Sequence, residues 1–457
     1  MPPADEVTHP GLPDTVRRVL AVLAGAGHEV ALVGGSVRDL GGGDAGSIDN
    51  WDVATSARPE QVAPLFAEAV WQNRFGTVTI VGPSPVEVTS YRTEGGYSDR
   101  RRPNEVRFGA SLEEDLGRRD FTINAVAWVP TDLDAGRGRV VDPFGGWADM
   151  EARLLRTVGE PRERFGEDAL RLVRAARFAG RFGLAIEPAT EAALRELAPT
   201  VAAVSPERIR DELVRILAAE VPSRAIRVLE HVGLLTPILP EVAALRGVPQ
   251  AKLAPGDALD HTLAAVDAVP RDEHASVRIG ALLHDIGKAA TLADGHFIGH
   301  ERVGAELAAE VLGRLRVPGW EAARIIHAVR HHMYAYDETW TDAAVRRFIR
   351  RLEPIGTTVL FALRRADNAA SGVGTSGKAN QADLERRLHL ELERQPDLLL
   401  RSRLAIDGHD LQRELGIDPG PRIGHVLDRL MERVVDDPSL NERSVLLRLA
   451  VEVAAER

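Results

Sequence analysis

A glycine pair followed by a short acidic stretch is the first feature of the chain that could carry chemistry. Gly34 and Gly35 end an apolar run, and a second predicted strand, 48–54, contains Asp52. Paired glycines let backbone N–H groups approach an anion closely. Carboxylates two residues apart on a strand point to one face, where they can hold divalent cations. Together these features predict a site for a triphosphate and its Mg²⁺ ions.

The residue on the same strand face as Asp52 is Asn50 rather than a second carboxylate. The nearby acid, Asp49, falls on the opposite face. An amide is neutral and a poor bridging ligand for a hard cation. One hypothesis is that Asn50 replaces aspartate in an otherwise active enzyme, and the rival is that Asp49 serves after a register shift of one residue. On the neighbouring strand, 86–91, Glu87 is a candidate third carboxylate.

A guanidinium, a carboxylate and an amide follow in the stretch 115–125, which we expect to be the start of a helix packed on the sheet. Arg119, Asp120 and Asn124 would then lie within about one and a half turns of each other. Such a set can bind phosphate and ribose hydroxyl groups. The alternative is ordinary ion pairing on a helix surface.

A carboxylate and three arginines at intervals of three residues are predicted to share one face of a helix over 167–177. Cytosine and adenine each present an amino donor beside a ring-nitrogen acceptor, whereas uracil and guanine present the reverse pattern. A carboxylate that accepts from the amine, beside an arginine that donates to the ring nitrogen, would therefore select C and A. The alternative is an i,i+3 salt bridge on a solvated face. The four residues are Asp168, Arg171, Arg174 and Arg177.

Histidines and aspartates in the second half of the chain have the spacing of metal ligands. An adjacent His-Asp pair follows an apolar helix, with one histidine upstream and further histidines and a late aspartate downstream. Imidazole and carboxylate groups suit Mn, Fe, Ni or Zn, so a divalent transition metal is expected. The alternative is a degenerate, metal-free domain. The candidate ligands are His261, His284, Asp285, His300, His332 and Asp367.

The amino-acid composition limits the classes of protein to which the chain can belong. A chain of 457 residues is too long for one core, so two to four domains are expected. Without cysteine there are no disulfides and no thiolate metal sites. The net charge of −11 means that a nucleic-acid partner needs a local basic surface. We find no apolar run of 18 residues and no basic, apolar leader at the N-terminus, so neither a membrane span nor export is expected, and the predicted location is the cytoplasm.

The periodicity of apolar residues predicts where the domains begin and end. Strand patterns dominate up to about residue 150, and helical patterns dominate afterwards. The predicted domains are a head with the glycine pair, a helical neck, a histidine-rich helical unit and a helical tail. Their expected ranges are 1–150, 151–250, 251–375 and 376–457.

Five stretches, in this order, resemble the motifs of the class II tRNA nucleotidyltransferases, the family of the CCA-adding enzymes and the bacterial poly(A) polymerases. They are 32–39, 118–125, 142–156, 165–171 and 207–212. The resemblance spans nearly the whole chain, and the arginine-rich composition is similar to that of actinobacterial proteins. The family resemblance implies an α+β fold, with a polymerase-β-like head followed by all-helical neck, body and tail domains. It also implies nucleotide or metal positions at Gly35, Arg38, Asn50, Asp52, Arg119, Asp168, Arg171, Arg174 and Arg177.

The histidine-rich unit resembles the HD phosphohydrolase superfamily. In some CCA-adding enzymes such a domain hydrolyses 2′,3′-cyclic phosphates and phosphomonoesters. The tail stretches 405–421 and 437–441 are also similar to this family, in which they grip the tRNA elbow, and a plain helical connection is the alternative.

The resemblance implies template-independent addition of CCA to the 3′ end of tRNA, with CTP, ATP and Mg²⁺. A poly(A) polymerase or an A-adding enzyme is the nearest alternative, and a catalytically dead nucleotide- or RNA-binding regulator is the alternative from another class. Asn50 is the residue that supports the last of these.

Overall fold

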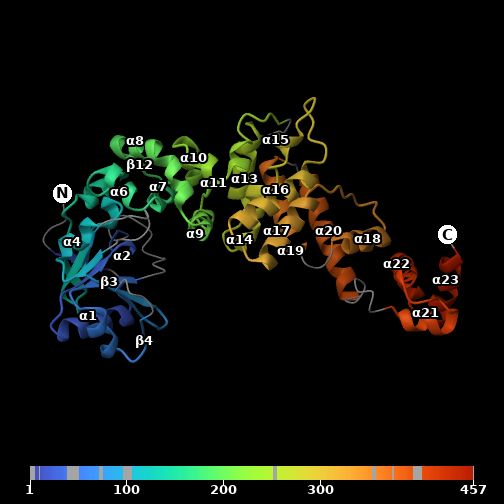
Figure 1. Cartoon of the computed structure of the whole chain (residues 1–457), viewed down its shortest axis with the longest axis horizontal. Coiled ribbons are helices and arrows are strands. Elements are labelled where there is room, and N and C mark those ends of the chain that lie inside the picture. Colours follow the sequence, from blue (N-terminus) through green and yellow to red (C-terminus); the bar gives the residue numbers. More distant parts are fainter. Residues whose placement is uncertain are drawn as a thin grey trace. The chain divides into compact units, whose positions relative to one another are not determined.

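The computed structural model describes residues 6–9, 11–38, 51–71, 76–95, 105–250, 255–352, 357–372, 375–394 and 404–455. The chain divides into two compact units, residues 1–240 and 241–457. Among the described residues, every strand belongs to the first unit (Figure 1). The mixed sheet followed by helices confirms the predicted α+β class.

The first unit is built on an eight-stranded sheet with the strand order β1-β10-β9-β2-β3-β6-β5-β4. Its strands are β1 (Val7–Thr8), β2 (Val30–Val33), β3 (Trp51–Thr55), β4 (Ala69–Val70), β5 (Thr77–Ile80), β6 (Val86–Ser90), β9 (Ala127–Asp132) and β10 (Arg137–Val141). Neighbouring strands are antiparallel except β3 and β6, which run parallel. Two small pairs lie outside this sheet, namely β7 (Arg92–Gly95) with β8 (Glu105–Phe108) and β11 (Leu154–Leu155) with β12 (Ala185–Ile186).

The two faces of the sheet pack against different parts of the unit. On one face, Leu20 and the other apolar residues of the first helix bury Leu32 and Val53. On the other face, Val33 and Ala54 belong to a second buried cluster. Successive side chains of a strand alternate between faces, so Asp52 points to the same face as Ala54. The helices that accompany the sheet are α1 (Asp14–Gly25), α2 (Gly35–Arg38), α3 (Pro59–Val62), α4 (Leu112–Gly117) and α5 (Gly146–Glu151), with the 3₁₀ segments η2 (Ala63–Leu65) and η3 (Thr122–Asn124).

Helices complete the first unit. They are α6 (Pro161–Glu167), α7 (Leu170–Phe182), α8 (Pro188–Leu197), η4 (Ala198–Ala203), α9 (Pro206–Leu217), α10 (Ser223–His231), α11 (Leu235–Ile238) and, across the division between the units, α12 (Pro240–Ala243). Gly183 ends α7 in the left-handed conformation, the usual place for glycine after a helix. Because α7 packs against both α9 and α10, the charged residues of these helices can meet.

The second unit is helical throughout its described part. Its helices are α13 (Ala258–Ala268), α14 (Ala275–Leu283), α15 (Lys288–Thr291), α16 (His300–Arg314), α17 (Gly319–His331), α18 (Asp342–Leu352), α19 (Thr357–Ala370), α20 (Thr375–Arg394), α21 (Gly408–Leu415), α22 (Pro421–Asp436), η6 (Pro438–Leu440) and α23 (Arg443–Ala455). Helices α13, α14, α17 and α19 pack on one another, and α16 packs on α17. Asp257 opens α13 and Asp407 opens α21 with the same capping box.

The last three helices have an apolar cluster of their own, which contains Leu430 and Leu446. Arg346 of α18 connects this part to the rest of the unit. Its guanidinium donates to the carbonyl oxygens of Val435 and Asp436 at 2.6 and 2.7 Å, and thereby caps the end of α22. None of the described helices combines the length and the hydropathy that crossing a membrane requires.

Candidate functional site

The turn between β2 and α2 brings the backbone close to an acidic side chain. Gly34 has a φ of +73°, a conformation that favours glycine. A Cβ atom at Gly34 would lie 2.9 Å from Asp52 Oδ2 and 3.8 Å from Arg119 Nη1. Gly35 follows as the first residue of α2. The predicted phosphate turn, carboxylate and arginine therefore converge at one place.

Asp52 lies on the central strand of the sheet between two partners. It is registered with Val33 of β2 and with Glu87 of β6. Burial raises the pKa of Asp52 to about 6, opposed by the charge of Arg119 and reinforced by that of Glu87. A half-buried carboxylate that is costly to ionise beside a second carboxylate is the environment that a bound cation relieves. The residues present therefore fit a divalent metal.

Asn50 and Asp49 lie outside the described residues. The described strand β3 begins at Trp51, so the two hypotheses on these positions stay predictions. Glu87 is placed by its register on the same face as Asp52, because paired residues of adjacent strands share a face.

A chain of hydrogen bonds runs from the glycine turn to the helices. Arg38 Nη1 donates to Asn124 Oδ1 at 3.0 Å, and Asn124 Nδ2 donates to Asp120 Oδ1 at 3.0 Å. Asp120 Oδ2 then accepts from Arg174 Nε of α7 at 2.7 Å. Arg119 joins the same group, since its Nη1 donates to the Asn124 carbonyl oxygen at 3.4 Å. Five predicted site residues are thereby held together.

The predicted helix over 115–125 is wrong in its extent. Helix α4 ends at Gly117, and only the 3₁₀ segment η3 follows. Asp120 and Asn124 nevertheless bond to each other, because the backbone turns again at Thr122. Burial by itself raises the pKa of Asp120, but the charge of Arg174 and the hydrogen bond from Asn124 outweigh it and lower that pKa to about 2.

Aromatic rings of α7 support Arg38. Its guanidinium carbon lies 4.3 Å from the centre of the Phe182 ring and 5.7 Å from that of Phe178. Such contacts hold a cation in place without neutralising it. The rings therefore hold the Arg38 guanidinium beside the glycine turn, where its Nη2 would lie 3.4 Å from a Cβ atom at Gly35.

The predicted continuous helix over 167–177 is also wrong, because it breaks at Asp168. Asp168 has an extended backbone and ends α6, and α7 begins at Leu170. The Asp168 carboxylate accepts from the Leu170 N–H at 3.1 Å, which helps to start the new helix. Arg171, Arg174 and Arg177 lie on α7 at the predicted spacing.

Asp168 is oriented by Arg208 of α9. Arg208 Nη1 and Nη2 donate to Asp168 Oδ1 and Oδ2 at 3.1 and 2.6 Å. Arg171 is held by Glu167 and by the carbonyl oxygens of Arg164 and Arg118, the latter two at 3.1 and 3.2 Å. When only hydrogen bonds to described residues are counted, Asp168 Oδ2 keeps one lone pair and Arg171 keeps its Nε–H and one Nη2–H. One acceptor beside one donor is the pattern that an adenine or cytosine edge complements.

Arg177 is buried, and its hydrogen bond goes to α9 rather than to the residues around Asp168. Its side chain is 9% exposed and its Nε donates to Glu212 Oε2 at 2.6 Å. Arg174 Nη1 also lies 3.9 Å from Glu212, so one buried carboxylate serves both arginines. The contacts of Arg177 tie α7 to α9, whereas those of Arg174 reach Asp120.

The six predicted metal ligands of the second unit converge, and they form two groups rather than one. In each group the ligand atoms lie within 4.8 Å of one another. All six residues are buried. The first group is His261, His284 and Asp367, and the second is Asp285, His300 and His332.

Asp285 stands between the two groups. Its Oδ2 lies 3.1 Å from His284 Nε2 and 3.5 Å from His261 Nε2, and its Oδ1 lies 3.5 Å from His300 Nε2 and 3.7 Å from His332 Nε2. Burial opposes the ionisation of Asp285, but His284 and the other imidazoles hold its pKa well below the usual range. An ionised carboxylate with one oxygen toward each group is suited to bridge two cations.

The histidine tautomers also fit metal ligation. His284, His300 and His332 each use Nδ1 to bond a carbonyl oxygen three residues earlier, at 2.8, 2.8 and 2.7 Å. An Nδ1–H donated to a carbonyl leaves the lone pair on Nε2, the atom that faces Asp285. Nε2 of both His300 and His332 is buried and makes no hydrogen bond to the described residues. These orphaned nitrogens are the donor set expected for a transition metal.

The backbone of the Asp285-Ile-Gly-Lys288 turn lies against α16. A Cβ atom on Gly287 would lie 2.1 Å from the His300 carbonyl oxygen and 2.6 Å from the Gly304 nitrogen. Only glycine lets the turn approach this closely. Lys288 Nζ lies 2.6 Å from both Asp285 Oδ2 and Gln250 Oε1, so it is a cation at the edge of the ligand cluster.

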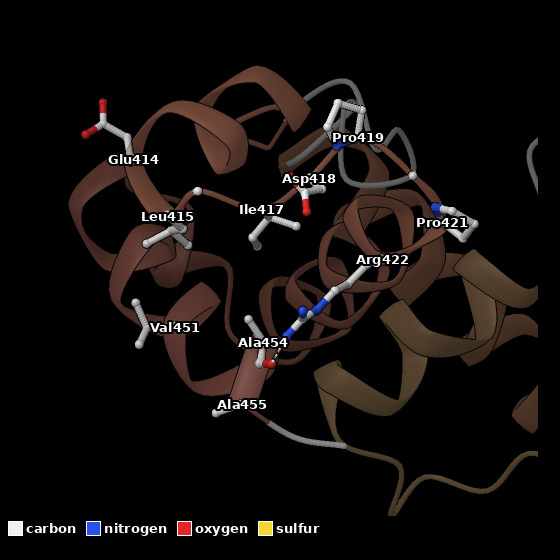
Figure 2. Close-up of a pocket in the computed structure, with 12 residues that line it drawn as sticks. Glu414, Leu415, Ile417, Asp418, Pro419, Pro421, Arg422, Val451, Ala454 and Ala455 are labelled. Atoms are coloured by element: carbon white, nitrogen blue, oxygen red, sulfur yellow. Dashed lines mark hydrogen bonds between the residues drawn. The ribbon is translucent and has the colours of Figure 1, made fainter.

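The tail stretch 405–421 forms much of a pocket of about 800 Å³, shown in Figure 2. Arg422 extends across it and donates to the Ala454 carbonyl oxygen at 2.8 Å. Glu414 and Asp418 are the acidic residues of the lining. Among the lining residues these two carboxylates face a single arginine. The expected contact with the tRNA elbow stays a prediction.

Three charged residues of these sites lie in motifs of the sequence but had no predicted role, namely Arg208, Glu212 and Lys288. Arg208 and Glu212 lie in the stretch 207–212, which the motif comparison had marked without assigning roles. The signal available for them was a pair of opposite charges on the same helix. Their partners, however, are 35 and 40 residues away in sequence and cannot be read from spacing.

Three parts of the chain match models of known protein families. Residues 30–156 match the poly A polymerase head domain, and residues 183–245 match the probable RNA and SrmB-binding site of polymerase A. Residues 257–371 match the HD domain.

Individual relatives cover the chain to different extents. It is 32% identical over 454 residues to the CCA-adding enzyme of Limosilactobacillus reuteri, with 98% of both chains covered. It is 34% identical over 421 residues to the A-adding tRNA nucleotidyltransferase of Deinococcus radiodurans, with 88% of this chain and 90% of that one covered. The match to the CCA-adding enzyme of Geobacillus kaustophilus is 46% identical over 220 residues, which is about half the length of that relative (52%) and 48% of this chain.

A solved structure extends the similarity to the fold. The crystal structure of the Bacillus stearothermophilus CCA-adding enzyme in complex with CTP superposes with a TM-score of 0.72 at 27% identity, and covers 95% of this chain and 96% of that one. The site geometry, the family models and the full-length relatives agree. The chain therefore belongs to the tRNA nucleotidyltransferase family that contains the CCA-adding enzymes and the poly(A) polymerases, and it carries an HD domain.

Proposed function

We propose that the chain completes the 3′ end of tRNA by adding CCA from CTP and ATP without a template. The terminal hydroxyl of the tRNA attacks the α-phosphate of the nucleotide, and pyrophosphate leaves. The observation that carries the proposal is the hydrogen-bonded chain from Arg38 through Asn124 and Asp120 to Arg174, because it joins a triphosphate turn to the helix that begins beside Asp168. This contact supports a base-reading pair and a phosphate site within one unit.

In this proposal each group of residues has a separate task. Gly34, Gly35, Arg38 and Arg119 bind the triphosphate, and Asp120 and Asn124 hold these cations in position. Asp52 and Glu87 hold Mg²⁺, which when bound would stabilise charge on the reacting phosphate. Asp168 and Arg171 read the base. The reaction belongs to the cytoplasm, where tRNA and nucleoside triphosphates are present.

The direct test uses tRNA that lacks its last three nucleotides, with the chain and its Asn50→Asp form. We expect two additions with CTP alone, three with CTP and ATP together, and none with ATP alone. Addition of A with ATP alone, without use of CTP, contradicts CCA addition and favours an A-adding enzyme. Binding of both nucleotides without turnover by either form favours a nucleotide-binding regulator.

The orientation of Asp168 by Arg208 makes a prediction about nucleotide choice. Replacing Arg208 by alanine frees the carboxylate to rotate, so the preference for CTP over UTP in kcat/KM should fall by about tenfold to a hundredfold, corresponding to one base-edge contact of 1–3 kcal/mol. Arg195→Ala is the matched control, because Arg195 also pairs with a carboxylate, Glu191, but on α8. An unchanged preference in Arg208→Ala, measured by incorporation of each nucleotide, would contradict this role.

The pKa of Asp52 makes a prediction about metal affinity. Only the ionised carboxylate binds a cation, so the affinity of the head for Mn²⁺ should fall about tenfold for each pH unit below the pKa of about 6. The measurement is the free Mn²⁺ signal in electron paramagnetic resonance between pH 7.5 and 5, on a chain whose HD site is removed by Asp285→Asn. In the further variant Asp52→Asn this pH dependence should disappear. Equal affinity at pH 7 and pH 5 would show that Asp52 is not a ligand.

The second unit supports a second function, metal-dependent phosphohydrolysis. The observation that favours it is the pair of ligand groups on either side of Asp285, with orphaned Nε2 atoms aimed between them. We infer that the first group and Asp285 hold one transition-metal ion and that Asp285, His300 and His332 hold another. Such ions supply a hydroxide at neutral pH, and Lys288 offers its charge to a phosphate oxygen. 2′,3′-Cyclic phosphates and phosphomonoesters are the proposed substrates.

A further inference from the structure

One side of α17, outside both sites, carries a row of four planar side chains. Trp320, Arg324, His327 and His331 stand at intervals of four, three and four residues. Residues at this spacing share one face of a helix. The buried residues of α17, which include Ile325 and Val329, point to a different side, toward the packed helices.

The four side chains meet as two pairs, a guanidinium over an indole and two imidazoles tilted by 47°. The Arg324 guanidinium lies 5.5 Å from the centre of the Trp320 ring, and the imidazoles of His327 and His331 have ring centres 4.5 Å apart. His274 of the neighbouring helix end lies 6.3 Å from Trp320. With a rise of 1.5 Å per residue, the row extends over roughly 16 Å. It therefore presents a line of flat, polarisable faces rather than an isolated aromatic residue.

The row is open to solvent where it is most apolar. The Trp320 side chain is 58% exposed, whereas tryptophan is usually well buried in a folded chain. Arg324 is exposed and both histidines are partly so. An exposed tryptophan beside a guanidinium gives a binding partner both apolar surface and positive charge.

The charge around the row is positive. Arg330 and Arg351 are charged neighbours of His331. Within the described ranges, Arg324, Arg330 and Arg351 form no ion pair, although the whole chain has a net charge of −11. The nearest acid on α17 is Glu321, which accepts from Ser276 Oγ at 2.8 Å. A surface with unpaired arginines on an acidic protein selects anionic partners.

We propose that the α17 row binds unpaired nucleotides of RNA, with bases stacked on Trp320 and the imidazoles and phosphates held by the arginines. Flat aromatic faces beside unpaired cations are the combination that single-stranded nucleic acid requires, and every base has a face to stack. A length of roughly 16 Å accommodates two or three nucleotides. The proposal relies on the proposed function only for RNA as the partner, and it assigns a surface outside the nucleotide site.

The test is binding of a fluorescent single-stranded RNA octamer, measured by anisotropy without CTP or ATP. The octamer ends in a 3′-deoxynucleotide, so it cannot be extended and offers no phosphomonoester to the HD domain. Full-length Trp320→Ala/Arg324→Ala is expected to bind at least about tenfold more weakly, which is the loss of one stacked base. Trp71→Ala/Arg58→Ala is the matched control, since it removes another exposed tryptophan and another exposed arginine, both in the first unit, and it should change binding less than twofold.

Two further measurements keep the outcome independent of folding and of nucleotide addition. In Arg324→Ala alone, the slope of log Kd against log salt should become shallower by about one. In the unaltered chain, 4-thiouridine in the octamer should crosslink to α17. Equal binding by the α17 variant and the control, or crosslinks only elsewhere, overturns the proposal, and so does a preference for duplex RNA. If tRNA addition fails while these results hold, only the proposed function is lost.

Discussion

Asn50→Asp is expected to raise the rate of nucleotide addition by at least about a hundredfold. This magnitude follows from the effect that changes around metal ligands have on enzyme activity. Asp52 shares its face of the sheet with Glu87, and a strand that continues through position 50 returns to that face two residues earlier. An amide there gives a hard cation a neutral oxygen, whereas a carboxylate gives it charge. The measurement is single-turnover incorporation of CTP on tRNA lacking its 3′ end.

Asp49→Asn is the control that separates the two hypotheses about this strand. If Asp49 already serves as the second ligand, its loss abolishes the activity of the starting chain, and Asn50→Asp adds nothing. If Asn50 stands at a vacated ligand position, Asp49→Asn changes the rate little and Asn50→Asp raises it. A chain that is fully active as it stands, with no gain from Asn50→Asp, would falsify the missing-ligand hypothesis.

Asp285→Asn is expected to remove both metal ions from the HD domain and to abolish phosphohydrolysis, with a loss of about a thousandfold or more on removal of the metal-generated nucleophile. Asp285 has one carboxylate oxygen toward each ligand group, so this single substitution reaches both. The metal content by mass spectrometry should fall from two ions per chain to none, and hydrolysis of a 2′,3′-cyclic nucleotide should stop.

His332→Ala separates the two groups. It removes a ligand of the second group only, so the chain should keep one ion. Asp272→Asn, an exposed change on the surface, is the matched control and should keep both. Nucleotide addition to tRNA should be unchanged in Asp285→Asn, which also shows that the variant is folded. Two ions retained by Asp285→Asn would refute the bridging role, and hydrolysis retained after metal loss would refute the metal-dependent activity.

The sequence was most informative where function needs residues that are close along the chain. The glycine turn could be read because Gly34 directly follows β2 and Asp52 lies on the adjacent strand β3, where it is paired with Val33. The HD ligands could be collected because His284 and Asp285 are neighbours. Their separation into two groups could not be predicted, since it depends on how α13, α16 and α19 pack around that pair.

Helix breaks and ion pairs between distant residues are the features of the site that could not be predicted from the sequence. Spacing placed Asp168 and Arg171 on one helix, but the Asp168 carboxylate binds the Leu170 N–H and the helix restarts there. A carboxylate that competes for backbone N–H groups ends one helix as readily as it starts the next. Arg208 was not found because a bidentate contact across 40 residues leaves no periodic trace.

The amide of Asn124 has a consequence for which substitutions the head can tolerate. Arg38 can only donate a hydrogen bond and an ionised Asp120 can only accept one, so the residue between them must accept on one side and donate on the other. An amide can do both, because it has an acceptor oxygen and a donor nitrogen. An ionised carboxylate of the same shape can only accept. Aspartate at position 124 would set two acceptors against each other beside a carboxyl group with a pKa of about 2. If Arg38 is replaced by a hydrogen-bond acceptor, Asp120 must therefore be replaced by a donor. A reversal of charge at one end of this series of hydrogen bonds requires a reversal at the other end.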